Sequence, residues 1–251
     1  MTNLSCAPEH RSASIAEAAA VLSSGGLVVL PTDTVYGIAA DAFDADAVAA
    51  LLAAKGRGRQ MPPPVLVASP TMLEVLAVDV PPAAKALADA FWPGALTIIV
   101  RAQPTLTWDL GETAGTVALR MPDHEVALDL LRTTGPLAVS SANRTGKPAA
   151  TNAAEASAQL GARVARYLDD GEAPGGQAST IVDATGPTLT IVREGAIDRE
   201  RLAAVVPHLR AVVEDESVDE AAPETPPETP AEAAAPTTAP DAESDPGRSA
   251  G

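Results

Sequence analysis

Short apolar segments alternate with amphipathic stretches along most of this chain, and this alternation limits the possible folds more than any other feature of the sequence. The segment "LVVL" at 27–30 is typical, because a helix-forming stretch precedes it and a Gly-Gly pair separates the two. Alternation of this kind predicts an α/β (α+β) fold, in which helices pack on a twisted mixed β-sheet. We expect the first helix to begin at Ser14, because Ser14 and Glu17 have the spacing of a capping box.

The same patterns predict the remaining elements. Helices are expected at 44–55, 71–77, 82–91, 124–133, 152–160 and 198–206, and strands at 27–30, 65–69, 96–100, 116–121, 137–142, 166–169, 179–183 and 189–193. Strands that follow one another near the end of this region favour a mixed sheet over a purely parallel one.

Charge and composition divide the chain into three parts. Of its 33 acidic and 17 basic residues, 11 acidic and one basic lie in 211–251, where Pro, Ala, Glu and Thr dominate. Such a segment buries too little apolar surface to offset its chain entropy. We therefore predict a leader at 1–13, a folded domain at 14–210 and a disordered acidic tail at 211–251. The domain itself lacks the basic surface typical of proteins that hold nucleic acid nonspecifically.

Several classes of site are excluded by residue counts. Cys6 is the only cysteine and the three histidines are scattered, so the sequence predicts neither a disulfide framework nor a zinc site. The N-terminus has no basic stretch followed by an apolar one, and no apolar run has the length of a membrane span. We expect a cytoplasmic protein with no membrane partner, no zinc and no organic cofactor.

Familiar nucleotide-binding and hydrolase motifs are also absent from the sequence. The segment "GRGRQM" at 56–61 has Met61 in place of a third glycine and follows a helix instead of opening one. No Gly-Lys-Ser/Thr ending of a P-loop occurs. Ser141 is flanked at two residues' distance by Val139 and Asn143 instead of glycines, which argues against a nucleophilic serine.

Polar clusters do occur at the ends of several expected strands. Each cluster alone is typical of an ordinary turn, since Ser, Asn, Gly and Pro favour turns. However, Lys55, Arg57, Arg120 and Arg193 all lie beside glycines, hydroxyls or strand ends. Cations with hydroxyls beside them suit a carboxylate or polyanionic ligand, which we expect in an open concave cleft.

Seven segments together resemble the YrdC-like family, the L-threonylcarbamoyladenylate synthases. They are "GGLVVLPTDTVYGIAADAF", "KGR", "FWPGALTIIV", "VALRMPDH", "SSANRTG", "STIVD" and "VREGAI", in the family's order and approximate spacing over about residues 14–200. The resemblance implies an enzyme that makes threonylcarbamoyl-AMP and pyrophosphate from L-threonine, bicarbonate and ATP. Partner proteins then transfer the threonylcarbamoyl group to an adenosine beside the tRNA anticodon, so tRNA would be only an indirect partner.

The resemblance also implies roles for individual residues. Carried over by position, the threonine contacts are Thr34, Arg120, Ser141 and Ser179, with Leu66 where the family commonly has His. The ATP contacts are Arg57, Thr116, Asn143, Thr151 and Arg193, with Lys55 nearby and Met61 where Asn is common. Lys55 and Arg57 would stabilise charge, and no residue would act as a covalent nucleophile.

The first of these segments is then interpreted as a binding edge. Thr34 would bond the substrate, Tyr36 would form a wall, and Gly37 would allow close approach of the backbone. Mg²⁺ is expected with ATP, held mainly by phosphate oxygens, with Asp33 as a candidate outer-sphere partner.

Two alternatives use the same residues. The first is a noncatalytic RNA-binding or ribosome-maturation module, against which the scarcity of aromatic residues and the charge of the domain argue. The second is a carbamoyltransferase of the hydrogenase-maturation type, whose zinc-finger cysteines this chain lacks.

Overall fold

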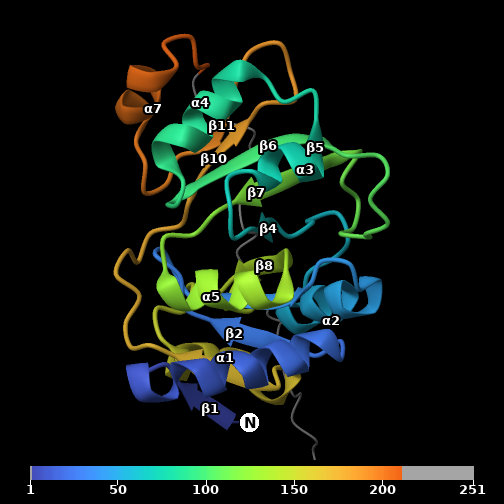
Figure 1. Cartoon of the computed structure of the whole chain (residues 1–251), viewed down its shortest axis with the longest axis vertical. Helices are drawn as coiled ribbons and strands as arrows, with labels where there is room; N and C mark the ends of the chain where they lie inside the picture. Colours follow the sequence, from blue (N-terminus) through green and yellow to red (C-terminus); the bar gives the residue numbers. More distant parts are fainter. Residues whose placement is uncertain (1, 211–251) are drawn as a thin grey trace, which may run out of the picture. The chain divides into compact units, whose positions relative to one another are not determined.

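A mixed β-sheet runs through residues 2–210, the part of the chain that this computed structural model describes (Figure 1). The strands are β1 (Thr2–Ser5), β2 (Val28–Leu30), β3 (Gly37–Asp41), β4 (Val65–Leu66), β5 (Ala77–Val78), β6 (Leu96–Ala102), β7 (Thr116–Arg120), β8 (Leu137–Ser141), β9 (Arg166–Asp169), β10 (Thr180–Asp183) and β11 (Thr190–Arg193). The helices are α1 (Pro8–Ser23), α2 (Ala45–Lys55), α3 (Met72–Leu76), α4 (Pro82–Phe91), α5 (Glu125–Thr134), α6 (Ala153–Leu160) and α7 (Arg199–Val205), with a 3₁₀ turn at Gly161–Arg163. The predicted acidic tail at 211–251 lies outside the described residues.

The strand order is β1-β9-β2-β3-β8-β4-β7-β6-β10-β11, and β5 pairs with β6. Parallel pairs join β1 to β9, β2 to β9, β4 to β7 and β6 to β10. The pairs β2/β3, β3/β8, β4/β8, β6/β7 and β10/β11 are antiparallel. The predicted twisted mixed sheet with packed helices is confirmed.

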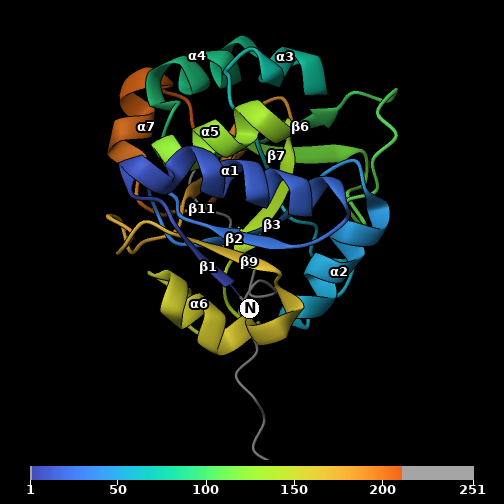
Figure 2. The ribbon, with the colours of Figure 1, turned by 60° about the horizontal axis from the view of Figure 1, so that its bottom comes forward.

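Both faces of β2 are buried, which explains why its sequence is apolar throughout. Val28 and Leu30 pack in one core cluster with α1 and α5, while Val29 packs in another with α2 and α6. Because side chains alternate across a strand, the apolar residues at 27–30 pack on both faces of the sheet. Figure 2 shows α1 and α6 on opposite sides of this part of the sheet.

The strands β6, β7 and β10 differ, because apolar residues occupy one of their faces far more fully than the other. Ile98, Leu119 and Val182 point into a core cluster that α3, α4 and α7 complete. The residues that alternate with them in these strands include Thr97 and Arg120. The face that is less fully covered by apolar residues carries the polar side chains of the candidate site.

The N-terminal region departs from the sequence prediction. Helix α1 begins at Pro8, so the predicted start at Ser14 is wrong. Pro is favoured in the first turn of a helix, where its missing N–H is not needed. Ser14 is buried within α1, and its hydroxyl donates to the Ser5 carbonyl oxygen at 2.6 Å. The division of the chain at residues 14 and 210 stays a prediction.

The sequence patterns do not predict three of the strands, namely β1, β3 and β5. β1 lies at the edge of the sheet and pairs with β9, more than 150 residues away, which no local pattern encodes. β3 is rich in Gly and Ala, which are poor strand formers, and it is held by pairing with β2 and β8. No helix within residues 2–210 is long and apolar enough to cross a membrane.

Candidate functional site

A cavity of about 480 Å³ lies where the sparsely covered face of β6, β7 and β10 meets the turn after β2 and the end of β8. The structure brings nine of the predicted site residues to its lining: Thr34, Arg57, Met61, Leu66, Thr116, Arg120, Ser141, Ser179 and Arg193. Lys55, Asn143 and Thr151 do not line it. The predicted open, concave shape of this cleft stays a prediction.

Strand alternation explains how β7 contributes to the cavity. Leu119 packs in the core and Val117 belongs to both the core cluster and the cavity lining, whereas Thr116, Ala118 and Arg120 line the cavity without belonging to the core cluster. The sequence "TVALR" therefore places a hydroxyl and a guanidinium on the same face of one strand. On β6, Thr97 and Ile99 line the cavity in the same way.

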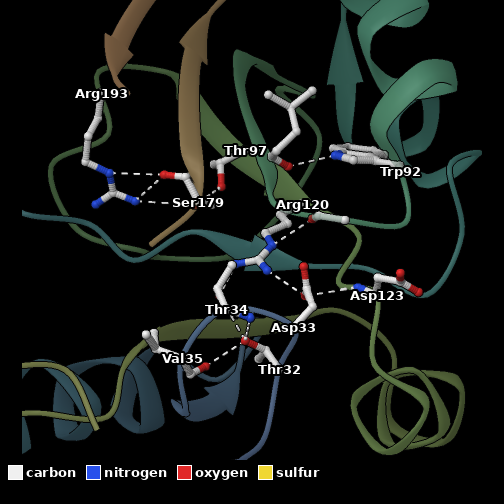
Figure 3. A network of polar contacts seen from close by, with 12 residues as sticks. Thr32, Asp33, Thr34, Val35, Trp92, Thr97, Arg120, Asp123, Ser179 and Arg193 are labelled. Atoms are coloured by element: carbon white, nitrogen blue, oxygen red, sulfur yellow. Dashed lines mark hydrogen bonds and ion pairs between the residues drawn. The ribbon is translucent and has the colours of Figure 1, made fainter. Parts of the chain in front are cut away.

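Arg120, a lining residue of the cavity, is the centre of a polar network (Figure 3). Its Nη1 donates to Thr34 Oγ1 at 3.0 Å, and its Nε donates to the Gly94 carbonyl oxygen at 3.0 Å. Nη2 forms an ion pair with Asp33 Oδ1 at 2.6 Å. Thr34 Oγ1 also lies 3.0 Å from Thr32 Oγ1. These contacts fix the plane of the Arg120 guanidinium at the cavity wall.

The Arg120 side chain is only 8% exposed, so its charge has little contact with water. This burial lowers the pKa of Arg120, while the charge and hydrogen bond of Asp33 act in the opposite direction. A buried guanidinium with one carboxylate neighbour still has N–H groups to offer, since the side chain carries five. The arrangement suits a second, bidentate carboxylate.

Ser179 and Arg193 form a second group, directly before β10 and at the end of β11. Ser179 Oγ lies 2.9 Å from Thr97 Oγ1, and Arg193 donates from Nη2 and Nε to the Ser179 carbonyl oxygen at 2.8 and 3.2 Å. Desolvation of the guanidinium, followed by the positive charges of Arg120 and Arg57, lowers the pKa of Arg193. Three guanidinium groups on one cavity repel one another, and an anionic ligand would relieve that repulsion.

Lys55 lies at the end of α2, where it is buried beneath the cavity wall. Its Nζ donates to the Asn143 carbonyl oxygen at 2.7 Å, to Asn143 Oδ1 at 3.1 Å and to the Ser141 carbonyl oxygen. Hydrogen bonds to several oxygens offset the free-energy cost of burying an ammonium group. Lys55 therefore fixes the Ser141 to Asn143 turn from behind.

The end of α2 also places Arg57. Gly56 adopts a left-handed conformation at the C-cap, and the Arg57 N–H donates to the Leu52 carbonyl oxygen, as in a Schellman motif. The chain then turns towards the cavity, and Arg57 Nη1 reaches Ser140 Oγ at 3.4 Å. The left-handed conformation of Gly56 explains why a glycine stands at this position.

Local hydrogen bonds hold two of the other predicted site residues, Thr116 and Thr151, whereas Met61 and Leu66 are described by their exposure and packing. Thr116 Oγ1 donates to the Thr113 carbonyl oxygen at 2.8 Å. Thr151 Oγ1 and N both donate to Glu155 Oε2, at 3.2 and 2.9 Å, beside the start of α6. Met61 is 39% exposed. Leu66 belongs to a core cluster as well as to the cavity lining.

Tyr36 lies on the cavity lining, where the binding edge was expected, and it also has a structural role. Its side chain is fully buried, and its hydroxyl donates to the Gly171 carbonyl oxygen at 2.7 Å and accepts from the Asp170 N–H at 3.1 Å. Burial raises the pKa of Tyr36 to about 12. The hydroxyl thus links the chain after β9 to the turn after β2, and the predicted role of Tyr36 as a wall of the binding site stays a prediction.

Sequence reasoning missed some cavity residues, including Thr97, Gln60, Leu110 and Thr113. Thr97 left a signal, because it is the only polar residue in the apolar segment "LTIIV". Leu110 left none, since it reaches the cavity through a loop. Arg59 fixes that loop through Asp109, with Nη2 2.8 Å from Oδ1 and 3.0 Å from Oδ2.

The sequence profile of the Sua5/YciO/YrdC family, described as "Telomere recombination", matches residues 20–195. The chain belongs to this family. A Mycobacterium tuberculosis member is 54% identical over 199 residues, which cover 79% of this chain and 92% of the relative. A Bacillus subtilis member named "Threonylcarbamoyl-AMP synthase" is 42% identical over 195 residues, which cover 76% of this chain and 56% of the relative.

Solved structures of family members share the fold. The Pyrococcus abyssi Sua5 structure in complex with L-threonine superposes with a TM-score of 0.80 at 34% identity, covering 84% of this chain and 62% of Sua5. This chain therefore spans less than two thirds of the length of that Sua5 structure. Escherichia coli YciO, at 22% identity and a TM-score of 0.71, supports the fold alone.

Proposed function

We propose that this family member is an L-threonylcarbamoyl-AMP synthase, which converts L-threonine, bicarbonate and ATP into threonylcarbamoyl-AMP and pyrophosphate. The observation that carries the proposal is the charge of the cavity: Arg57, Arg120 and Arg193 line one space together with hydroxyl groups. Relatives that bear this activity in their names support it. An amino acid carboxylate and a triphosphate are the anions that the reaction requires.

Threonine is assigned to the end of the cavity formed by Thr34 and Arg120. The planar guanidinium fork of Arg120 matches a carboxylate in shape and charge. Ser141 and Ser179 supply further hydroxyls, and Leu66 supplies an apolar surface for a methyl group. The P. abyssi Sua5 structure, which was solved in complex with L-threonine, supports this assignment.

ATP is assigned to the end formed by Arg57, Arg193 and Thr116. The two guanidinium groups would neutralise phosphate oxygens, which carry most of the charge of the nucleotide. Met61 lies at the exposed margin of this end. Lys55, Asn143 and Thr151 would act from outside the cavity lining, with Lys55 and Asn143 holding the turn that carries Ser141.

The chemistry needs no protein nucleophile. The threonine amine attacks the carbon of bicarbonate, a C–O bond breaks and water leaves, which gives the carbamate. An oxygen of the carbamate then attacks the α-phosphorus of ATP, and the bond to pyrophosphate breaks. The residues described along the cavity lining include no carboxylate, imidazole or thiol. The chain therefore contributes by positioning the substrates, by neutralising charge and by excluding water from the labile carbamate and the mixed anhydride.

Magnesium fits this site as a companion of ATP. Among residues 2–210, no group of three or more His, Cys, Asp or Glu side chains is placed to hold a metal ion. Mg²⁺ commonly keeps phosphate and water oxygens as ligands, so the metal would enter with the nucleotide. Asp33, the predicted outer-sphere partner, does not line the cavity and is bonded to Arg120.

The product would pass to cytoplasmic proteins that transfer the threonylcarbamoyl group to tRNA, so tRNA would not need to bind this chain. The decisive experiment measures pyrophosphate release from purified protein with each substrate omitted in turn. We expect release only when threonine, bicarbonate and ATP are all present, with the adenylate as co-product. Release that is independent of threonine, or tight RNA binding without turnover, would refute the proposal.

A further inference from the structure

Asp33 lies behind Arg120 when seen from the cavity. Arg120 lines the cavity and Asp33 does not, yet Asp33 Oδ1 is 2.6 Å from Arg120 Nη2. The Asp33 side chain is 14% exposed, so the ion pair is almost removed from water. Figure 3 shows the two side chains pointing towards each other, with Thr34 beside them.

The position of Asp33 is itself fixed on two sides. Its Oδ1 also accepts the main-chain N–H of Asp123 at 3.0 Å. Its main chain lies against Gly175, where a Cβ atom would come within 2.6 Å of the Asp33 carbonyl oxygen. A carboxylate held this closely can transmit a fixed orientation to the group that it binds.

Arg120 has three fixed bonds, of which only the one to Asp33 is to a charged acceptor. The other two go to the Gly94 carbonyl oxygen and to Thr34 Oγ1. Hydrogen bonds to charged acceptors are shorter and stronger than neutral ones. Without Asp33, rotation about the last bonds of the Arg120 side chain would be opposed mainly by one carbonyl and one hydroxyl.

We propose that Asp33 is a positioning residue that orients the Arg120 guanidinium towards the carboxylate of the amino acid substrate. This inference rests on the proposed function, because it takes threonine as the ligand of Arg120. Asp33 itself touches no substrate. Its contribution is the acceptor oxygen at Oδ1, which fixes the fork so that the remaining N–H groups of Arg120 face the cavity.

The test compares Asp33→Ala with Asp33→Asn by calorimetric titration with L-threonine. Asp33→Ala removes the acceptor, and we expect the Kd for threonine to rise by about tenfold or more. Asp33→Asn keeps an oxygen at the same position without the charge, so we expect it to restore part of the affinity, to a Kd between those of Asp33→Ala and wild type. An Asn variant as weak as the Ala variant would overturn the role of the acceptor oxygen.

L-threoninamide is the probe that separates positioning from general damage, because it lacks the carboxylate. Asp33→Ala should leave the Kd for threoninamide unchanged, and an equal loss for both ligands would overturn the proposal. In an Arg120→Ala background, Asp33→Ala should weaken threonine binding no further, since the residue acts through Arg120. A further, additive loss would also overturn it.

Controls complete the design. Glu17→Ala removes another ion pair, between Glu17 and Arg166 at 2.6 Å, and should leave threonine binding unchanged. If Asp33→Ala fails to fold, Asp33→Ser, which keeps a short acceptor for the Asp123 N–H, should show the same selective loss. Wild-type protein that binds threonine but releases no pyrophosphate would refute the proposed function alone, whereas wild-type protein that binds no threonine would refute both proposals.

Discussion

The ends of the cavity proposed for threonine and for ATP hold their arginines in different electrostatic surroundings. Arg120 is 8% exposed and forms an ion pair with Asp33, so its charge is balanced before a ligand arrives. Arg193 is exposed as a residue, but its guanidinium lies against Ser179 and is partly desolvated. None of the ion pairs found among residues 2–210 includes it. The positive charges of Arg120 and Arg57 repel the charged form of Arg193 and so help to lower its pKa.

This difference matches the ligands proposed for each end. A small carboxylate needs an oriented partner more than it needs a large positive charge. A guanidinium that is buried and ion-paired is such an oriented partner. A triphosphate carries several charges, which an excess of positive charge can neutralise. We infer that threonine affinity depends mainly on geometry and ATP affinity mainly on charge, and the experiments below test that contrast.

The largest effect is expected at Arg120. Arg120→Ala should raise the KM for threonine by about ten- to a hundredfold, because a charge-assisted bidentate contact is lost and Asp33 is left buried without its partner. Arg120→Lys should restore little, since an ammonium lacks the planar fork. Steady-state pyrophosphate release measures both variants. Near-normal threonine KM in Arg120→Ala would remove this residue from the site.

A smaller effect, with opposite chemistry, is expected at Arg193. Arg193→Ala should raise the KM for ATP by about tenfold and leave the KM for threonine nearly unchanged. Arg193→Lys should restore most of the loss, because charge is the main requirement at this end. Raising the salt concentration should weaken ATP use more than threonine use in the wild type, since exposed charges are screened most. Equal salt effects on both substrates would contradict the contrast.

Much of this arrangement was predictable from sequence, for reasons that particular residues show. Arg120 and Thr116 could be placed on one face of a strand, because "TVALR" alternates and its ends are polar. The end of α2 was signalled by Gly56, whose left-handed conformation explains its presence. The family resemblance then grouped residues that are distant in the sequence, and nine of them line one cavity.

Other features depend on contacts that no local pattern specifies. Whether Lys55 faces the cavity or the Asn143 turn depends on where β8 ends in space. Tyr36 lies on the cavity lining, but no local pattern indicates that its hydroxyl bonds to Gly171 in the chain after β9. Strand β1 gains its partner from β9, and the Cys6 N–H reaches the Asp169 carbonyl oxygen at 2.9 Å. In each case a long-range contact overrides the local preference.

A glycine substitution tests the threonine end without changing any charge. In Gly175→Ala, the added Cβ would lie 2.6 Å from the Asp33 carbonyl oxygen and 3.2 Å from Thr34 Cα. We expect the free energy of unfolding to fall by about 1–3 kcal/mol, as is usual for overpacking. We also expect the KM for threonine to be higher in the variant than in the wild type. The KM for ATP should change little. Thermal unfolding and pyrophosphate release provide the measurements.

Gly186→Ala is the matched control for this variant. Neither glycine has a left-handed φ, and a Cβ at Gly186 would meet only the Thr188 carbonyl oxygen, at 3.8 Å. Stability and both KM values should therefore stay close to wild type. If both glycine variants lose the same stability, the close packing of Gly175 on Asp33 and Thr34 is not what matters.

The smallest effect concerns pH and a histidine near the threonine end. His124 is 14% exposed, its Nε2 lies 3.6 Å from Asp170 Oδ2, and its Nδ1 has no hydrogen-bond partner among the described residues. Burial lowers the pKa of His124 below the ordinary 6.5, although Asp170, Asp33 and Glu125 act to raise it, and Arg11 adds to the lowering. The unfolded chain therefore binds a proton more readily than the folded one.

Because the pKa of His124 is lower in the folded chain than in the unfolded chain, its contribution to stability is fully present above about pH 6.5. That contribution is lost as the pH falls through the pKa of His124 in the folded chain. We expect His124→Gln to reduce the difference in the free energy of unfolding between about pH 8 and about pH 5, as measured by urea titration. The arginines of the ATP end do not titrate in this range, so they add nothing to that difference. An unchanged difference in His124→Gln would mean that His124 titrates alike in the folded and unfolded chains, and that other groups cause the loss of stability in acid.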